Sequence, residues 1–201
     1  MFTGIITHTV DVLKSQSTSS GMLLRIKKPR DWDDLVLGES IAMNGVCLTV
    51  TAIHEDDYEC QLVAETLAKT SFGREVPERL NAERAMRAED KFGGHFVQGH
   101  VDTAGKVSAV DVSAGLVLSV RFPEEFMELV VAKGSIVIDG ISLTVASLRG
   151  NVCSVAIIPF TKTHTTIADR AVGDFVNIEF DMIGKYVVQT IKAREAHEKT
   201  A

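Results

Sequence analysis

The stretch VLGESIAMNGVCLTV at residues 36–50 reappears 95 residues later as VAKGSIVIDGISLTV at residues 131–145. Seven of the fifteen aligned positions are identical, which chance does not explain. In each copy an apolar run reaches Asn-Gly or Asp-Gly and then continues with alternating apolar and polar residues, a pattern typical of a β-hairpin. The repeat therefore predicts that one β-structure is built twice.

The repeat extends along almost the whole chain, and further aligned pairs are Gly4 with Gly99, Thr66 with Thr161, and Glu83 with Glu179. Short runs rich in Val, Ile, Leu and Thr, separated by Gly and Ser clusters, are typical of small β-barrels. We therefore predict an all-β fold of two tandem barrels with short helices, the helices at residues 32–37 and 123–132.

We expect the first barrel over residues 1–96 and the second over residues 97–186, with the Gly93–Gly94 pair as a linker. The tail over residues 183–201 predicts an amphipathic helix, because Ile183, Val187 and Ile191 recur every four residues among charged residues. We place the boundary between the second barrel and the C-terminal helical unit, residues 187–201, at residue 187. The apolar stripe of the helix could serve assembly between chains or pack back onto its own barrel.

Composition excludes several classes of protein. The net charge is −6 and the 21 Lys and Arg residues are scattered, so we expect no nucleic-acid partner. No apolar run approaches 18 residues and MFTGIITHTV does not resemble a signal peptide, so we expect no membrane partner and a cytoplasmic location. The three cysteines, Cys47, Cys60 and Cys153, are odd in number and far apart, so we expect reduced thiols.

Alternation after residue 46 places Cys47, Thr49 and Thr51 on one face of a strand, and Ser142 and Thr144 fall likewise in the second copy. Such a polar wall suits a flat heterocycle with several carbonyl and ring-nitrogen groups. The alternative is that the stripe is only the hydrated face of a sheet. Its presence in both copies favours a binding site.

The two histidines of GGHFVQGH, His95 and His100, lie five residues apart, on opposite faces of an extended segment, with no third ligand nearby. We therefore expect no metal. The two copies differ at a few aligned positions, where the chemistry would need them to differ: Cys47 against Ser142, Ile5 against His100, Gly38 against Lys133, and Glu65 against Phe160.

A series of motifs resembles riboflavin synthase of the alpha-chain type, which carries two lumazine-binding repeats. The motifs are MFTGI (1–5), NGVCLTV (44–50), GGHFVQGHVD (93–102), KGSIVIDGISLTV (133–145) and IEFD (178–181). The resemblance spans about residues 1–190 and implies two six-stranded Greek-key barrels. It also implies a homotrimer joined through the C-terminal helices, with each active site between the first barrel of one subunit and the second barrel of a neighbour.

The implied reaction is a dismutation. Two molecules of 6,7-dimethyl-8-ribityllumazine exchange a four-carbon unit and give riboflavin and 5-amino-6-ribitylamino-uracil. The resemblance implies no cofactor, and association with lumazine synthase stays open. The 7-methyl group of the lumazine is acidic because the ring delocalises the resulting carbanion, so we expect most of the acceleration to come from holding two rings face to face.

Residue by residue, the resemblance implies that catalysis depends on Phe2, Ser40, Cys47, His100, Lys133, Thr144 and Asp181. The first pocket would be lined by Gly4, Ile5, Ile6, Cys47, Leu48, Thr49, Val63, Ala64, Glu65 and Thr66. The second would be lined by Gly99, His100, Val101, Lys133, Ser142, Leu143, Thr144, Ile158, Pro159, Phe160 and Thr161.

His100 is our candidate proton carrier, because imidazole is the side chain that changes protonation near neutral pH. Asp181 is expected to orient a hydroxyl group. Phe160 stands where the other copy has Glu65, so the second pocket is expected to hold its ligand differently, by stacking.

Two other functions compete with the enzyme. The first is a non-enzymatic antenna protein of the same fold that binds lumazine or flavin. The second is a structural tandem barrel that binds peptides or sugars, against which the low aromatic content of 6% counts. Retention of Cys47, His100, Ser142 and Thr144 favours the enzyme.

Overall fold

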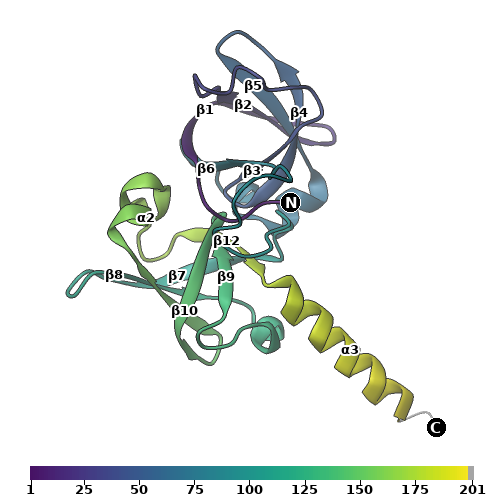
Figure 1. Ribbon diagram of the computed structural model, residues 1–201, viewed down its shortest axis with the longest axis vertical. Helices are drawn as coiled ribbons and strands as arrows, with labels where there is room; N and C mark the ends of the chain where they lie inside the picture. The colour runs from purple at the N-terminus through teal and green to yellow at the C-terminus, as the bar shows by residue number, and fades with distance from the viewer. Residues whose placement is uncertain (199–201) are drawn as a thin grey trace.

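The computed structural model describes residues 1–198 and contains two closed six-stranded barrels followed by one long helix (Figure 1). All strand pairs within both barrels are antiparallel. The predicted all-β fold with tandem barrels is confirmed.

The first barrel has the strand order β1-β2-β5-β4-β3-β6. Its strands are β1 (His8–Thr18), β2 (Gly21–Lys27), β3 (Ser40–Met43), β4 (Val46–Ile53), β5 (Asp57–Val63) and β6 (Arg79–Arg84). A short helix α1 (Ala64–Lys69) and a 3-10 turn η1 (Ser71–Gly73) join β5 to β6.

The second barrel repeats this order, with β7-β8-β11-β10-β9-β12 around the barrel. Its strands are β7 (Thr103–Asp111), β8 (Leu116–Arg121), β9 (Ser135–Ile138), β10 (Ile141–Arg149), β11 (Val152–Ile157) and β12 (Phe175–Phe180). Its helical turns are η2 (Glu124–Leu129), α2 (Pro159–His164) and η3 (Thr166–Asp169). The matching order explains why the sequence repeats at a nearly constant spacing.

The Asn-Gly and Asp-Gly pairs form the tight turns that the sequence predicts. Asn44 and Gly45 join β3 to β4 with φ of 44° and 78°, and Asp139 and Gly140 join β9 to β10 with φ of 46° and 82°. Two successive positive φ values identify a type I′ turn, which matches the twist of a hairpin and favours these residue types.

Each barrel has its own hydrophobic core. On β4, Val46, Leu48 and Val50 are buried, whereas Thr49 and Thr51 are exposed. The matching strand β10 alternates in the same way. The expected division of each strand into a core face and a polar face is therefore confirmed.

The two barrels meet through a symmetric pair of amide contacts. The side chain of Asn81 donates to the backbone carbonyl of Asp139 over 2.8 Å, and Asn177 donates to the carbonyl of Asn44 over 2.9 Å. All four residues are almost fully buried. Because each contact joins a β6 or β12 residue to the hairpin turn of the other barrel, the barrels are related by an approximate two-fold axis.

The prediction of a helix at residues 32–37 is wrong. The segment runs through turns, in which Trp32 and Leu35 are 3% and 8% exposed and pack on the first core. Six residues form too few helical hydrogen bonds to make a stable helix without tertiary support. Here the tertiary contact is burial of the Trp32 side chain in the first core, and the backbone follows a series of turns that allows it. At residues 123–132 only the 3-10 turn η2 forms.

The C-terminal helix α3 (Met182–Glu198) begins before the expected boundary at residue 187. The Asp181 carboxylate accepts a hydrogen bond from the backbone of Ile183 over 3.0 Å, so Asp181 caps the helix directly after β12. The helix projects away from both barrels in Figure 1, and Ile183, Val187 and Ile191 are more than half exposed. Packing of this stripe back onto the barrel is not seen. Residues 199–201 of the expected helix lie outside the described residues.

Among the helices of residues 1–198, none is both long and apolar enough to cross a membrane.

Candidate functional site

Two segments cross between the barrels at their junction. The N-terminal crossing segment (residues 1–6) and the middle crossing segment (residues 93–101) meet in an antiparallel bridge between Phe2 and Val97. The Phe2 amide donates to the Val97 carbonyl over 2.8 Å, and the reverse bond is 3.2 Å long. Since Phe2 and Val97 are aligned positions of the repeat, the bridge lies on the approximate two-fold axis.

The N-terminal crossing segment lies on the second barrel. The Ser142 amide donates to the Gly4 carbonyl over 2.8 Å. A Cβ atom on Gly4 would fall 2.7 Å from the Ser142 Cβ, so only glycine allows this approach. Ile6 packs on the core of the second barrel.

The middle crossing segment lies on the first barrel in the same way. The Cys47 amide donates to the Gly99 carbonyl over 2.8 Å, and a Cβ atom on Gly99 would fall 2.5 Å from the Cys47 Cβ. Val101 packs on the core of the first barrel.

The sequence-based grouping of the pocket residues is therefore wrong in one respect. Gly4, Ile5 and Ile6 belong with Ser142, and the residues Gly99, His100 and Val101 belong with Cys47. From the order of the sequence we expected each crossing segment to line the barrel of its own repeat. In the structure the segments cross at the bridge between Phe2 and Val97, and each one lines the barrel of the other repeat.

Two buried glutamates hold the crossing segments in place. The Glu83 carboxylate accepts hydrogen bonds from the amides of Thr3 and Gly4 over 2.7 and 2.9 Å. The Glu179 carboxylate accepts hydrogen bonds from the amides of Gln98 and Gly99, also over 2.7 and 2.9 Å. Burial raises the pKa of both carboxyls, and the hydrogen bonds oppose that shift.

Glu83 and Glu179 are aligned in the repeat, but the predicted set of site residues includes neither of them. The signal that could have found them is that both copies place an Asn and a Glu two residues apart in the last strand of the barrel, Asn81 with Glu83 and Asn177 with Glu179. A buried carboxylate requires hydrogen-bond donors, and the glycines of the crossing segments supply them as backbone amides.

On the first barrel these contacts enclose a cavity of about 230 Å³, which we call the first site. It is lined by Val46, Cys47, Glu65, Thr66, Lys69, Thr70, Gly99, His100 and Val101. Most of these residues were predicted to bind substrate. The structure thus brings Cys47 of β4, Glu65 and Thr66 of α1, and His100 of the middle crossing segment to one cavity. Val63 and Ala64 lie exposed at the start of α1, beside Glu65.

The matching place on the second barrel is the second site, around Ser142 of β10. Ser142 is half-buried and Thr144 is exposed on the same strand face. Thr161, Pro159 and Phe160 begin α2, directly after Ile158. Lys133 precedes β9 with φ of 68° and donates its amide to the carbonyl of Val145 over 2.8 Å, so its backbone is fixed while its side chain is exposed.

Phe160 is 63% exposed, and its ring stacks on His164 with centroids 4.0 Å apart. Glu65 at the matching place of the first barrel pairs with Lys69 over 3.0 Å. The two sites therefore differ at this position, one with a paired carboxylate and the other with an exposed aromatic surface.

Several other predicted residues are less accessible than the sequence suggested. The side chains of Leu48 and Leu143 point into the two cores, so only their backbone atoms face the sites. Phe2 is fully buried at the junction with Ala42, Val97 and Val137. Ser40 pairs with Thr49 across β3 and β4.

His95 is a further candidate site residue, which the predicted set omits. Its Nδ1 atom lies 2.8 Å from the Ser142 hydroxyl oxygen, and the residue is 9% exposed. Burial lowers the pKa of the imidazole, against a smaller opposing effect of the Asp181 carboxylate. The middle crossing segment therefore brings one histidine to each site, His95 to the second and His100 to the first.

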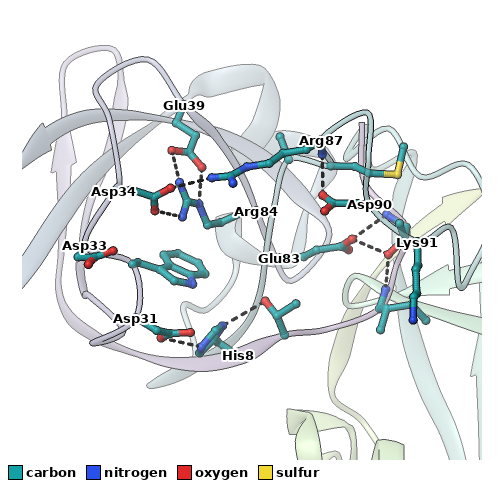
Figure 2. Close-up of a pocket in the computed structure, with 16 residues that line it drawn as sticks. His8, Asp31, Asp33, Asp34, Glu39, Glu83, Arg84, Arg87, Asp90 and Lys91 are labelled. Carbon is teal, nitrogen blue, oxygen red and sulfur yellow. Dashed lines mark hydrogen bonds and ion pairs between the residues drawn. The ribbon is translucent and has the colours of Figure 1, made fainter.

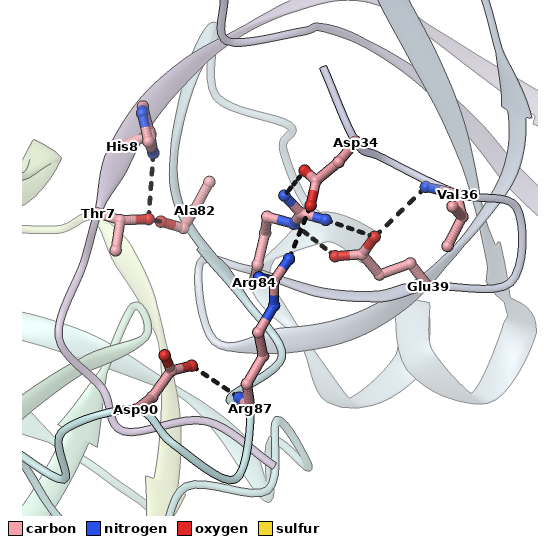
Figure 3. Close-up of polar contacts among 9 residues, drawn as sticks. All are labelled: Thr7, His8, Asp34, Val36, Glu39, Ala82, Arg84, Arg87 and Asp90. Carbon is pink, nitrogen blue, oxygen red and sulfur yellow. Dashed lines mark hydrogen bonds and ion pairs between the residues drawn. The ribbon is translucent and has the colours of Figure 1, made fainter. Parts of the chain in front are cut away.

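A larger cleft of about 600 Å³ opens elsewhere on the first barrel, beside Trp32 (Figure 2). Its walls carry many charges, but these largely satisfy one another. Arg84 binds Glu39 through Nη2 over 2.8 Å and also pairs with Asp34, which in turn pairs with Arg87 (Figure 3). This network fixes the loop around Trp32, and few of its charges remain free to recognise a ligand.

Comparison with known proteins agrees with the geometry. The lumazine-binding domain family matches residues 3–85 and again residues 98–181. Riboflavin synthase of Bacillus amyloliquefaciens is 38% identical over 97% of this chain and 92% of its own length. Riboflavin synthase of Mycobacterium bovis is 39% identical over 96% of this chain and 99% of its own length.

The fold is similar to that of solved structures of LumP. The complex of LumP with riboflavin superposes with a TM-score of 0.82 at 20% identity and covers 90% of this chain and 99% of LumP. At that identity the match shows a shared fold, whereas the full-length relatives are much closer in sequence. The chain therefore belongs to the lumazine-binding domain family and, within it, to the riboflavin synthases.

Proposed function

We propose that this protein catalyses the dismutation of two 6,7-dimethyl-8-ribityllumazine molecules by transfer of a four-carbon unit. The products are riboflavin and 5-amino-6-ribitylamino-uracil. The observation that carries the proposal is the pair of sites, each made of one barrel and the crossing segment of the other repeat. A reaction between two identical molecules needs two similar binding sites.

Positioning supplies most of the acceleration in this mechanism. Holding two reactants in register can lower a barrier by roughly 7–11 kcal/mol. The rigid parts of each site are backbone groups, since the Cys47–Gly99 and Ser142–Gly4 bonds fix both crossing segments against their barrels. Side chains then handle protons, because the 7-methyl carbanion is already stabilised by the ring that carries it.

His100 is the proposed proton carrier of the first site. It is exposed and lines the same cavity as Cys47 and Glu65, so it can reach a ligand bound there. General acid or base help of this kind contributes on the order of 10²–10⁴-fold. A His100→Gln variant that kept full turnover with unchanged substrate affinity would contradict this role.

The remaining residues act through position. Thr49 and Thr144 present hydroxyl groups on the open faces of β4 and β10. Lys133 contributes a charge at the second site. Asp181 fixes the start of α3 directly after β12, and Phe2 holds the two crossing segments together, since its ring is buried where they meet.

Assembly completes the active site in this proposal. The two sites of one chain lie on different barrels, so two bound lumazines must be brought face to face by another copy. A homotrimer in which the first site of one subunit faces the second site of its neighbour does this. The exposed stripe of Ile183, Val187 and Ile191 on α3 supports such an assembly, because it has no partner within one described chain.

A non-enzymatic antenna protein is the main alternative, because LumP shares the fold. The experiment is to incubate the purified protein with 6,7-dimethyl-8-ribityllumazine and to follow riboflavin absorbance. Riboflavin and the uracil product in equal amounts support the proposal. Tight binding with an unchanged spectrum would refute it and support the antenna.

A further inference from the structure

The contact between His95 and Ser142 distinguishes the second site from the first. On the first barrel the residue aligned with Ser142 is Cys47, whose thiol is only a weak hydrogen-bonding group. On the second barrel the Ser142 hydroxyl lies 2.8 Å from an imidazole nitrogen that is almost fully buried. The two sites therefore offer different chemistry to the same kind of ligand.

The surroundings hold this pair in a single arrangement. The His95 amide donates to the Thr3 carbonyl over 3.2 Å, which ties the ring to the N-terminal crossing segment. A Cβ atom on Gly94 would lie 3.1 Å from the Ser142 oxygen, so the backbone packs closely over the hydroxyl. A hydroxyl confined in this way keeps its hydrogen bond to the nearest acceptor.

The far nitrogen of the ring is also informative. Within residues 1–198, Nε2 of His95 is buried and has no hydrogen-bond partner. The charged group that acts on the ring is the Asp181 carboxylate, which raises the His95 pKa, whereas burial lowers it by a larger amount. A neutral imidazole with one nitrogen against a hydroxyl oxygen can accept a proton from that hydroxyl, as the histidine of a serine and histidine pair does.

We propose that His95 is a positioning residue of the second site: its Nδ1 atom accepts the Ser142 hydroxyl proton, so that the Ser142 oxygen meets the bound lumazine as a proton acceptor. This inference rests on the proposed dismutation. It makes Ser142 the group that touches the substrate, with His95 acting through it.

The proton step is balanced. As the Ser142 oxygen takes a proton from the 7-methyl carbon, the C–H bond breaks and a new O–H bond forms. The original hydroxyl proton passes to Nδ1, and the electron pair of the C–H bond is delocalised into the lumazine ring. The imidazolium formed in this way returns its proton to the Ser142 oxygen by the same path.

The experiment compares His95→Asn with wild type. The Asn amide can occupy the place of Nδ1 and hold the Ser142 hydroxyl, but it cannot accept a proton near neutral pH. We expect kcat for riboflavin formation to fall about 10²-fold, with affinity for the lumazine close to that of wild type. Exchange of the 7-methyl hydrogens with deuterated solvent, followed by NMR, should fall in parallel.

The pH profile separates this role from a purely structural one. In wild type, kcat should rise with pH through the lowered pKa of His95 and then stay level, because only the neutral ring accepts a proton. This acid limb should be absent in His95→Asn. The exposed histidine variant His54→Asn serves as the matched control and should keep the wild-type profile.

A double-mutant cycle tests the coupling. Ser142→Ala should lose as much activity as His95→Asn, and the double variant should be no worse than either. Independent, multiplicative losses would overturn the inference, as would a His95→Asn variant with wild-type kcat or an intact acid limb. If His95→Asn does not fold, loss of the acid limb in Ser142→Ala decides in favour and its retention decides against. Absence of riboflavin formation by wild type would instead refute the proposed function itself.

Discussion

The backbone amide of Cys47 donates a 2.8 Å hydrogen bond to the carbonyl of Gly99, a residue from the other repeat. Its symmetric counterpart joins Ser142 to Gly4 at the same distance. Each barrel therefore depends on a segment of the other repeat to complete its site. This exchange ties the two halves of the chain together at both sites.

The close approach at Gly99 predicts a sharp difference between two glycines with positive φ. Gly99→Ala would place a Cβ atom 2.5 Å from the Cys47 Cβ, whereas Gly38→Ala would meet nothing within 4 Å. Both substitutions carry the left-handed backbone strain of roughly 1–2 kcal/mol. We expect Gly99→Ala to lower the free energy of unfolding clearly more than Gly38→Ala in urea titrations. Equal losses would show that the segment is not packed on Cys47.

Removal of the Glu179 carboxylate should loosen the middle crossing segment. Glu179→Ala leaves the buried amide of Gly99 and the partly buried amide of Gln98 without their acceptor, at a cost of about 1–3 kcal/mol for a buried group. Hydrogen exchange at residues 98–101 should become faster, and lumazine affinity at the first site should fall. Glu89→Ala, an exposed residue in a turn, should change neither quantity.

The three cysteines should react differently with iodoacetamide. Burial raises the pKa of the Cys60 thiol to about 12 and that of Cys153 to about 11, and both residues are fully buried. Cys47 is half-buried and lines the first site. Mass spectrometry of the native protein should therefore find Cys47 alkylated first, and bound riboflavin should protect it. Faster labelling of Cys60 or Cys153 would contradict the placement of these side chains.

A buried ion pair lies at the barrel junction. The Arg170 Nε donates to the Asp139 carboxylate over 2.9 Å, and Asp139 is fully buried. Asp139→Asn should cost about 3–5 kcal/mol, because it leaves a nearly buried guanidinium uncompensated. Asn already occupies the aligned position 44, so the amide fits the turn. Asp139→Asn combined with Arg170→Leu should recover most of the loss in thermal and urea unfolding; no recovery would contradict the pairing.

His95 should make stability depend on pH. Burial lowers the pKa of its imidazole in the folded state. Above the ordinary pKa of about 6.5 the ring is neutral in both states and its contribution is complete. As the pH falls from the ordinary pKa toward the lowered one, the unfolded chain binds the proton first and stability is lost, and the loss levels off below the lowered pKa, where both states are protonated. The unfolding free energy of wild type relative to His95→Asn should therefore decrease between pH 7 and pH 5, and a constant difference would contradict the burial of this ring.

The sequence alone was sufficient for the fold because the repeat carries its own turn chemistry. The Asn44–Gly45 and Asp139–Gly140 pairs specify type I′ turns, and strict alternation on either side specifies which face is buried. Two copies of that pattern predict two barrels. The polar face with Cys47 and Thr49 was also correctly identified, since side-chain direction follows directly from the period of a strand.

The exchange of crossing segments could not be predicted from the sequence. Gly4 and Gly99 indicate a close backbone approach, but both barrels offer an equivalent strand to approach, and only the bridge between Phe2 and Val97 decides between them. The path of residues 32–37 was missed for a related reason. Burial of Trp32 against the first core is a tertiary contact, and it overrides the local pattern.

The most direct test of the central claim is the number of lumazine molecules that one chain binds. Calorimetric titration with a 6-methyl-8-ribityllumazine that lacks the 7-methyl group, and so cannot react, should give two bound molecules per chain. Substitution of Cys47 by Trp should remove only one of them, because the cavity beside Gly99 would be filled. A single bound molecule per chain in the unsubstituted protein would contradict the account of two sites built by exchanged segments.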